Sequence, residues 1–172
     1  LTLWNLYAFF VTYARLEGFD PSKPPVPLAE RADLDRWVLS RLQSLVDVMT
    51  HAMDGFLVHR GVRVAQDFIE DVSNWYVRRG RRRYWKADAD MDKLAAYQTL
   101  YEVLTTLVQL LAPVMPFWTE DIYQNLVRAV DPEASVSVHL TEWPDAQEDR
   151  RDSELDTAMA SVQQVVRAGR AA

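Results

Sequence analysis

The chain has 172 residues, with 19 lysines and arginines against 25 aspartates and glutamates, a net charge of −6 and no cysteine. This length suits a single domain with its own core, and the lack of cysteine excludes disulfides, thiolate metal sites and a cysteine nucleophile. No apolar run reaches the roughly 18 residues that a membrane span needs. We therefore expect a soluble, cytoplasmic protein without membrane contact.

The composition favours helix over strand. The whole chain contains five glycines, and the long segments between prolines are rich in leucine, alanine, valine, arginine and glutamate. We predict an all-α fold, an up-and-down helical bundle of four to five helices with a C-terminal helical extension.

The first predicted helix spans residues 3–16 and is apolar on nearly every side, which implies contact with more than one neighbour. Four prolines then fall within residues 21–27, and because proline removes a donor and favours extended geometry, this segment is predicted to be a stiff connector. The second helix begins near Asp33 and continues to Gly55, with apolar residues at spacings of three and four. Its predicted buried face consists of Leu34, Trp37, Val38, Leu42, Leu45, Val48, Met49 and Ala52.

The third predicted helix begins near Gly61, and its apolar stripe runs to Trp75 and Tyr76, which we interpret as packing residues. Extending the same stripe brings Arg79 and Arg83 onto it. Because arginine is rarely buried without a partner, we expect the helix to project beyond its core at this point.

A fourth helix is predicted over residues 92–111 and a fifth over 119–129, with a short proline-containing turn between them that implies antiparallel packing. Residues 136–140 alternate and are expected to be extended. An acidic stretch up to Asp152 is predicted to be a linker, followed by a final amphipathic helix.

The sequence is thus divided into two parts. Residues 1–145 are assigned to the helical bundle. Residues 146–172 are assigned to a linker and the start of a C-terminal extension that looks truncated.

Residues 73–86 contain six cations interleaved with aromatic side chains and no acid, whereas the rest of the chain has 13 cations against 25 acids. The basic charge is therefore confined to one place, which restricts where a phosphate backbone is attracted. Guanidinium groups pair with phosphates, and indoles stack on unpaired bases. We predict a nucleic-acid contact here. Its candidate residues are Asn74, Arg78, Arg79, Arg81, Arg82, Arg83, Trp85 and Lys86.

A different interpretation of this run stays open. Arginines near a helix C-terminus also favour the helix dipole and pair with acids elsewhere in the fold. The chain would then be a helical interaction domain whose arginine cluster meets an acidic protein partner.

Asn5 and Phe9 form a second candidate site, one turn apart on the first helix. An asparagine amide can read a base edge, and a phenyl ring one turn on can support the neighbouring base by stacking. Core packing is the alternative for a phenylalanine in an apolar helix.

Other chemistry is not indicated. The three histidines lie eight or more residues apart without a second ligand at helix spacing, so we predict no metal site. No phosphate loop, dinucleotide motif or nucleophile motif occurs, so no catalytic residue is proposed. We interpret adjacent carboxylate pairs, such as Glu70 with Asp71, as solvated charges, because neighbours on a helix point about 100° apart.

Several segments together resemble the anticodon-binding helical bundle of class I aminoacyl-tRNA synthetases. They include Asp-Arg-Trp at residues 35–37, Ala-Pro-x-x-Pro-Phe at 112–117, and Ser-Asn-Trp-Tyr-Val-Arg at 73–78 followed by the arginine run. The first two recur in the isoleucine, valine and leucine groups. The third is closest to the isoleucyl-tRNA synthetase group, and a valyl- or leucyl-tRNA synthetase stays as an alternative.

The resemblance implies that this bundle follows a catalytic domain in the same parent chain and holds the anticodon stem-loop of tRNA. It implies that Asn5 and Phe9 occupy positions that contact anticodon bases in related enzymes. The parent would be an isoleucine-tRNA ligase whose catalytic domain uses ATP and Mg²⁺. The fragment itself is expected to hold no cofactor, because the catalytic motifs of the class, of the His-Ile-Gly-His and Lys-Met-Ser-Lys-Ser types, are absent from it.

Overall fold

The computed structural model describes residues 2–86 and 90–171. Within these ranges the chain is helical and has no strand, which confirms the all-α prediction. Two π-helical segments, Val72–Val77 and Gln124–Arg128, continue α3 and α6 without a break. The α-helices are α1 (Thr2–Glu17), α2 (Asp33–Asp54), α3 (Val58–Asp71), α4 (Arg78–Trp85), α5 (Met91–Leu111), α6 (Pro116–Tyr123) and α7 (Ser153–Ala171).

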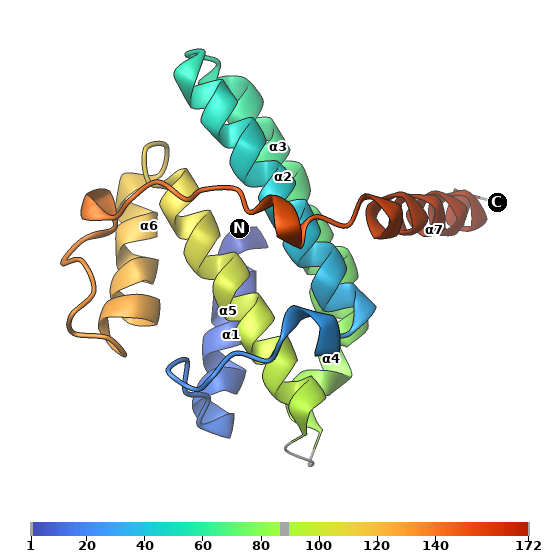
Figure 1. Cartoon of the computed structure of the whole chain (residues 1–172), viewed down its shortest axis with the longest axis horizontal. Helices are drawn as coiled ribbons and strands as arrows, with labels where there is room; N and C mark the ends of the chain where they lie inside the picture. Colours follow the sequence, from blue (N-terminus) through green and yellow to red (C-terminus); the bar gives the residue numbers. More distant parts are fainter. Residues whose placement is uncertain (1, 87–89, 172) are drawn as a thin grey trace.

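The helices pack as a bundle around α5, which contacts α1, α2, α4 and α6 (Figure 1). Helices α2 and α3 form an antiparallel hairpin whose closed end projects beyond the bundle. The segment after α6 crosses the face of the bundle, and α7 then extends away from it on the side opposite α6 (Figure 1). The antiparallel packing of α5 and α6 follows from the short turn between them, as predicted.

The core lies between α5 and α2. Leucines on α5 are buried on almost every side, because this helix has neighbours all round, and the apolar face of α2 meets them as its spacing predicted. Val48 is the exception on that face: it is 40% exposed. The largest fully buried aliphatic side chains are Leu39, Leu42, Leu45, Met49, Leu100, Leu104, Leu107, Leu110 and Ile122.

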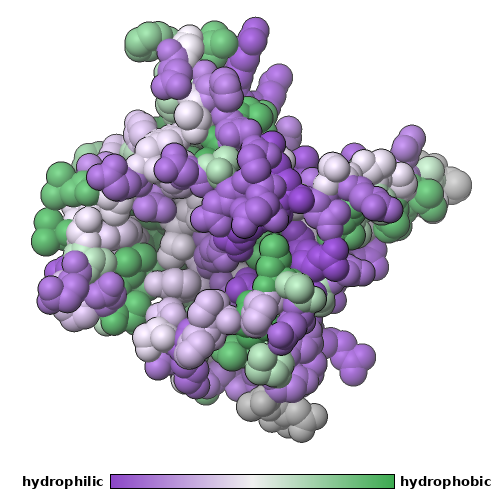
Figure 2. All heavy atoms as spheres, viewed as in Figure 1, coloured by the Kyte–Doolittle hydropathy of each residue, from purple (hydrophilic) through white to green (hydrophobic). Residues whose placement is uncertain are grey.

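The outer surface is mostly hydrophilic where the segment between α6 and α7 crosses the bundle (Figure 2). Apolar groups are visible at the tip of the α2–α3 hairpin, over α6 and along α7 (Figure 2). Phe56 at the hairpin tip is 90% exposed, and Phe117 on α6 is 89% exposed.

The proline-rich connector is not helical, as predicted, and it is fixed to α5. The Val26 N–H donates to Gln98 Oε1 at 2.8 Å, and Gln98 Nε2 donates to the Pro24 carbonyl at 3.0 Å. Arg31 Nε donates to the Val26 carbonyl at 3.0 Å. These bonds satisfy the backbone of a segment that cannot satisfy itself.

Three expectations about local structure are wrong. The third helix begins at Val58, one turn before Gly61, and residues 138–140 form a turn of 3₁₀-helix where extended geometry was expected. The fifth predicted helix also begins three residues early, at Pro116. The segment before α7 contacts α2, because Gln147 N–H donates to Gln43 Oε1 at 2.9 Å and Arg151 pairs with Asp47. These contacts hold the segment on α2.

The π-helical segment changes which residues of the arginine run face the core. A π turn inserts one extra residue into the helix, so the buried stripe moves from the positions of Arg79 and Arg83 to those of Gly80 and Tyr84, which are buried. The expectation that the helix projects beyond its core is therefore wrong for α4. Helix α4 is packed on the bundle through Gly80 and Tyr84, while Arg79 faces outward.

A buried carboxylate fixes α4 in place. Asp35, near the start of α2, is 0% exposed. Arg83 donates to both of its oxygens, from Nη1 at 2.8 Å and from Nη2 at 2.6 Å, and Tyr76 Oη donates to Oδ1 at 2.6 Å. Arg83 Nη2 also lies 2.8 Å from Asp92 Oδ1 on α5. One carboxylate thus joins α2, the π segment and α4, and its arginine partner reaches α5.

The surrounding groups keep the protonation states that this network needs. Burial raises the pKa of the Tyr76 and Tyr84 phenols. Tyr84 Oη donates to the Ala96 carbonyl at 3.3 Å, and Tyr76 Oη, whose proton goes to Asp35, lies at the same distance from that carbonyl. Burial alone lowers the pKa of the Arg83 guanidinium, but its hydrogen bonds with Asp35 and the charge of that carboxylate outweigh this effect and raise it. Neutral phenols and a fixed cation therefore surround Asp35.

Arg83→Met is expected to lower the free energy of unfolding by about 3–5 kcal/mol, because it leaves the Asp35 carboxylate buried without its cation. Arg82→Met is the matched control: Arg82 is exposed on the same helix, so its loss should change stability by less than about 0.5 kcal/mol. Urea unfolding followed by circular dichroism measures both. Similar losses for the two variants would contradict a structural role for the Arg83 pair.

Alkaline pH is expected to destabilise the fold partly through Tyr84. Its pKa is raised in the folded state, so its stabilising contribution is complete below the unfolded pKa of about 10 and is lost as the pH rises toward the folded value. Each such phenol lowers the free energy of unfolding by about 1.4 kcal/mol per pH unit in that range. In urea unfolding between about pH 10 and 12, Tyr84→Phe should make the decline shallower by this amount. Parallel declines would show that Tyr84 ionises equally in both states.

Candidate nucleic-acid interface

Helix α1 lies against α4, which brings the two predicted sites together. The Phe9 ring packs edge-on against Tyr84, with ring centroids 5.1 Å apart, and Tyr13 lies 5.7 Å from Trp85. Arg81 lies above both candidate rings, with its Cζ 5.9 Å from the Phe9 centroid and 5.2 Å from the Trp85 centroid. The sequence placed these residues on separate helices, and the structure joins them through Arg81.

Asn5 and Phe9 differ in exposure. Asn5 is exposed one turn before Phe9 on α1, so its amide faces solvent. Phe9 is half-buried because one edge of its ring packs on Tyr84 while Arg81 covers part of its face. The sequence left open whether Phe9 packs in the core or is available for stacking. In the structure it packs against the core on one side and is partly exposed on the other.

Four arginines of the run stay open to solvent: Arg78, Arg79, Arg81 and Arg82 are exposed. None of the carboxylates that the structure describes lies within 4.0 Å of these four guanidinium groups. Trp85, next to them at the end of α4, is 43% exposed. This cluster, which we call the arginine face, offers guanidinium groups that are not paired with any described carboxylate, beside a partly exposed ring.

Arg83 and Lys86 do not belong to the arginine face, because both pair with carboxylates of the fold, so the run that the sequence treated as one site contains two kinds of cation. The Arg83 side chain is 12% exposed and is held by Asp35 and Asp92. Lys86 Nζ lies 3.1 Å from Asp90 Oδ2 and 2.9 Å from Asp92 Oδ2. Both cations fasten α4 to the start of α5.

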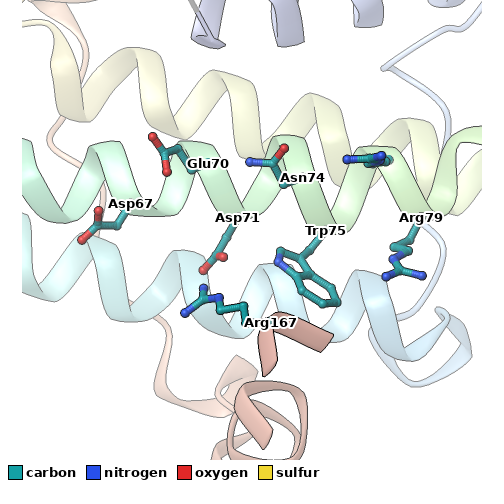
Figure 3. A pocket seen from close by; sticks show the side chains of 8 residues that line it. Asp67, Glu70, Asp71, Asn74, Trp75, Arg79 and Arg167 are labelled. Atoms are coloured by element: carbon teal, nitrogen blue, oxygen red, sulfur yellow. The ribbon is translucent and has the colours of Figure 1, made fainter. Parts of the chain in front are cut away.

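The remaining candidate of the run, Asn74, lies one turn before Arg78. Asn74 is exposed on the π segment and borders a hollow of about 700 Å³ together with Arg78 and Arg79 (Figure 3). Tyr76 is buried, as predicted for a packing residue. Trp75 is half-buried, and Arg79 Cζ lies 5.1 Å from its ring centroid.

Two residues near the interface were missed from the sequence. Asp35 lies in the first turn of α2, and its place directly after Leu34 and two residues before Trp37, inside an apolar stripe, was a signal that it is buried. Arg167 on α7 lines the same hollow as Asn74. No local pattern connected α7 with the arginine run, because about 90 residues separate them along the chain.

The described residues contain no group of three or more potential metal ligands. None of the described helices combines the length and the apolar character needed to cross a membrane.

A helical bundle that exposes guanidinium groups beside aromatic rings on one edge has the character of a nucleic-acid-binding module. Residues 35–172 match the family described as the anticodon-binding domain of tRNA ligase. The chain belongs to this family, and the resemblance noted in its sequence is confirmed.

The chain is also similar to proteins named isoleucine-tRNA ligase. It is 48% identical over 173 residues to that of Thermus thermophilus and 48% identical over 172 residues to that of Dehalococcoides mccartyi, covering 100% of this chain in both cases. It is 44% identical over 169 residues to that of Methanosarcina barkeri, covering 96% of this chain. The chain spans 16–17% of the length of these relatives.

Proposed function

We propose that this chain binds the anticodon stem-loop of a tRNA as one part of an isoleucine-tRNA ligase, whose other parts attach isoleucine to that tRNA with ATP. The observation that carries the proposal is the joint exposure of Arg81, Arg82 and Trp85 beside Phe9, in a chain whose relatives along its whole length are isoleucine-tRNA ligases. The chain would supply recognition and positioning. It carries neither catalytic motif of the class.

The roles follow from the chemistry of the side chains. Guanidinium groups of the arginine face bind backbone phosphates, which fixes the position of the RNA without reading its sequence. Trp85 and the open part of Phe9 support unpaired bases by stacking, and the Asn5 amide reads a base edge. Arg83 and Lys86 act indirectly, because they hold α4 in the orientation that presents its neighbours.

The proposal includes partners beyond the RNA. The catalytic domain of the same parent chain would be the second partner, and ATP with Mg²⁺ would bind there. This part of the chain would need no cofactor of its own, and the parent enzyme would act in the cytoplasm.

Two other functions are kept as alternatives. The same fold in a valyl- or leucyl-tRNA synthetase would use the arginine face in the same way, and a charging assay of the parent enzyme with the three amino acids separates these cases. A helical interaction domain would use the arginine face on an acidic protein.

Arg81→Gln and Arg82→Gln should each weaken binding of any tRNA anticodon stem-loop by a similar factor, because phosphate contacts do not depend on sequence. Each variant should also make the slope of log affinity against log salt concentration shallower by about 1. Filter binding from 50 to 200 mM salt measures both quantities. Arg63→Gln removes an exposed charge from α3 and is the control. A loss for Arg63→Gln as large as for Arg81→Gln would show a net-charge effect.

Asn5→Ala should chiefly reduce the discrimination between cognate and non-cognate anticodons, by about 5- to 150-fold, because a base-edge contact is lost. Competition binding with the two stem-loops gives the ratio directly. Equal losses for both RNAs would remove Asn5 from the residues that read sequence.

Tryptophan fluorescence separates RNA binding from binding of an acidic protein. The emission of Trp85 is the difference between the spectra of wild type and Trp85→Phe. Adding the stem-loop should decrease this difference, because a base stacks on the indole and quenches it. A polyglutamate peptide offers charge without a stacking surface and should leave that difference unchanged. Quenching by the peptide alone would favour the interaction domain.

A further inference from the structure

We propose that the hollow between α3 and α7 holds one unpaired nucleotide of the bound RNA, with its phosphate at the arginine end and its base at the acidic end. The inference rests on the proposed function and adds to it a second contact, nearer the start of α4 than the contact that involves Phe9 and Trp85. The residues that line the hollow are Asp67, Glu70, Asp71, Asn74, Trp75, Arg78, Arg79 and Arg167.

The order of these groups along the helix defines the ligand. In Figure 3 the side chains form two rows, Glu70 with Asn74 on one side and Asp71, Trp75 and Arg79 on the other. The carboxylates Asp67, Glu70 and Asp71 lie toward one end, where the Arg167 side chain lies beside Asp71 (Figure 3), and Arg78 and Arg79 lie toward the other end. From residue 71 to residue 79 the helix rises by about 12 Å, so the hollow suits an elongated ligand that is anionic at one end and donates hydrogen bonds at the other.

A nucleotide with an amino or imino group on its base has this character. The carboxylate end holds three acids against the single Arg167, so it disfavours a second phosphate, and a plain polyanion fits the hollow poorly. Carboxylates accept hydrogen bonds from base amino groups, as they do from cytosine N4. Glu70 and Asn74, both exposed and one turn apart, are placed to read the edge of a base that has left its stack.

The middle of the hollow provides a stacking surface. Trp75 is half-buried, and the Arg79 guanidinium lies 5.1 Å from its ring centroid. Indole and guanidinium planes both support unpaired bases. The packing role inferred for Trp75 therefore leaves part of its ring at the hollow.

Helix α7 is held in place as the far wall. Gln163, a buried residue on α7, donates through Nε2 to Asp71 Oδ1 at 3.2 Å, and Asp71 Oδ2 lies 4.0 Å from Arg41. Burial raises the pKa of Asp71, although Arg41 and Gln163 act against this. Asp71 is thus no simple solvated charge, and its contacts leave Asp67 and Glu70, which are both exposed, as the carboxylates open to a ligand. Arg167, one turn beyond Gln163, completes the lining.

The hollow is continuous with the arginine face. Arg78 and Arg79 line it, and Arg82 lies one turn further along α4. An RNA strand can place one phosphate at Arg82 and the next at Arg78. The base between them can then enter the hollow while both phosphates stay next to arginines. We therefore assign the occupant to the same RNA molecule.

A double-mutant cycle tests the proposal, with this chain and anticodon stem-loops in which single loop positions lack their base. For wild type, removal of one particular base should lower affinity about tenfold. In Glu70→Gln and Arg167→Gln, removal of that same base should cost about twofold or less, because its site is already damaged. Arg63→Gln and Glu154→Gln remove exposed charges outside the hollow and should keep the full tenfold loss.

The outcomes separate the two proposals. Equal losses from base removal in wild type and in both hollow variants, with Arg81→Gln still weakening binding, would overturn the nucleotide site and leave the proposed function standing. Failure of wild type to bind any stem-loop would overturn both. Circular dichroism of Glu70→Gln and Arg167→Gln controls for folding, and since both side chains are exposed, we expect native spectra.

Discussion

The packing of α4 on this bundle depends on the hydrogen bonds of the buried Asp35 carboxylate. A carboxylate without water is costly unless it is paired and fully hydrogen-bonded, and here Arg83 and Tyr76 meet that need together. Because its partners come from the π segment and α4, satisfying one charge fixes the direction of the helix that carries the arginine face. A rigid helix under long, flexible side chains reduces the conformational entropy that is lost on binding, and this favours affinity.

The arginine run thus contains cations that pair with carboxylates of the fold and cations that are exposed to solvent. The π turn inserts one residue, which carries Gly80 and Tyr84 to the core and leaves Arg79 at the surface. Arg83 and Lys86 secure the helix, while Arg78, Arg79, Arg81 and Arg82 are exposed. A π turn within a helix often accompanies a functional site. In this chain its effect is a change of register that separates supporting cations from surface cations.

Helix α7 links the C-terminal part of the chain to the same region. Helix α7 forms one side of the hollow, where Gln163 donates a hydrogen bond to Asp71. The acidic stretch before α7 is held on α2 by a hydrogen bond and an ion pair. The arginine face and the hollow therefore lie on one continuous length of helix, from α3 through α4, and two different neighbours, α1 and α7, complete them. In our proposal, this geometry lets one helix contact successive nucleotides of a single RNA.

The sequence by itself determined the helical class, most helix boundaries and the basic segment, because hydrophobic spacing, proline positions and charge are local properties that survive in any environment. The sequence also indicated the protein family, through motifs such as Asp-Arg-Trp. It did not determine which arginines are exposed, since a one-residue insertion into the helix has no marker in its composition. Nor did it show that Asp35 neutralises Arg83 or that Arg167 lines the same hollow as Asn74. Those pairings join residues 48 and 93 positions apart, and only the packing of the helices brings them together.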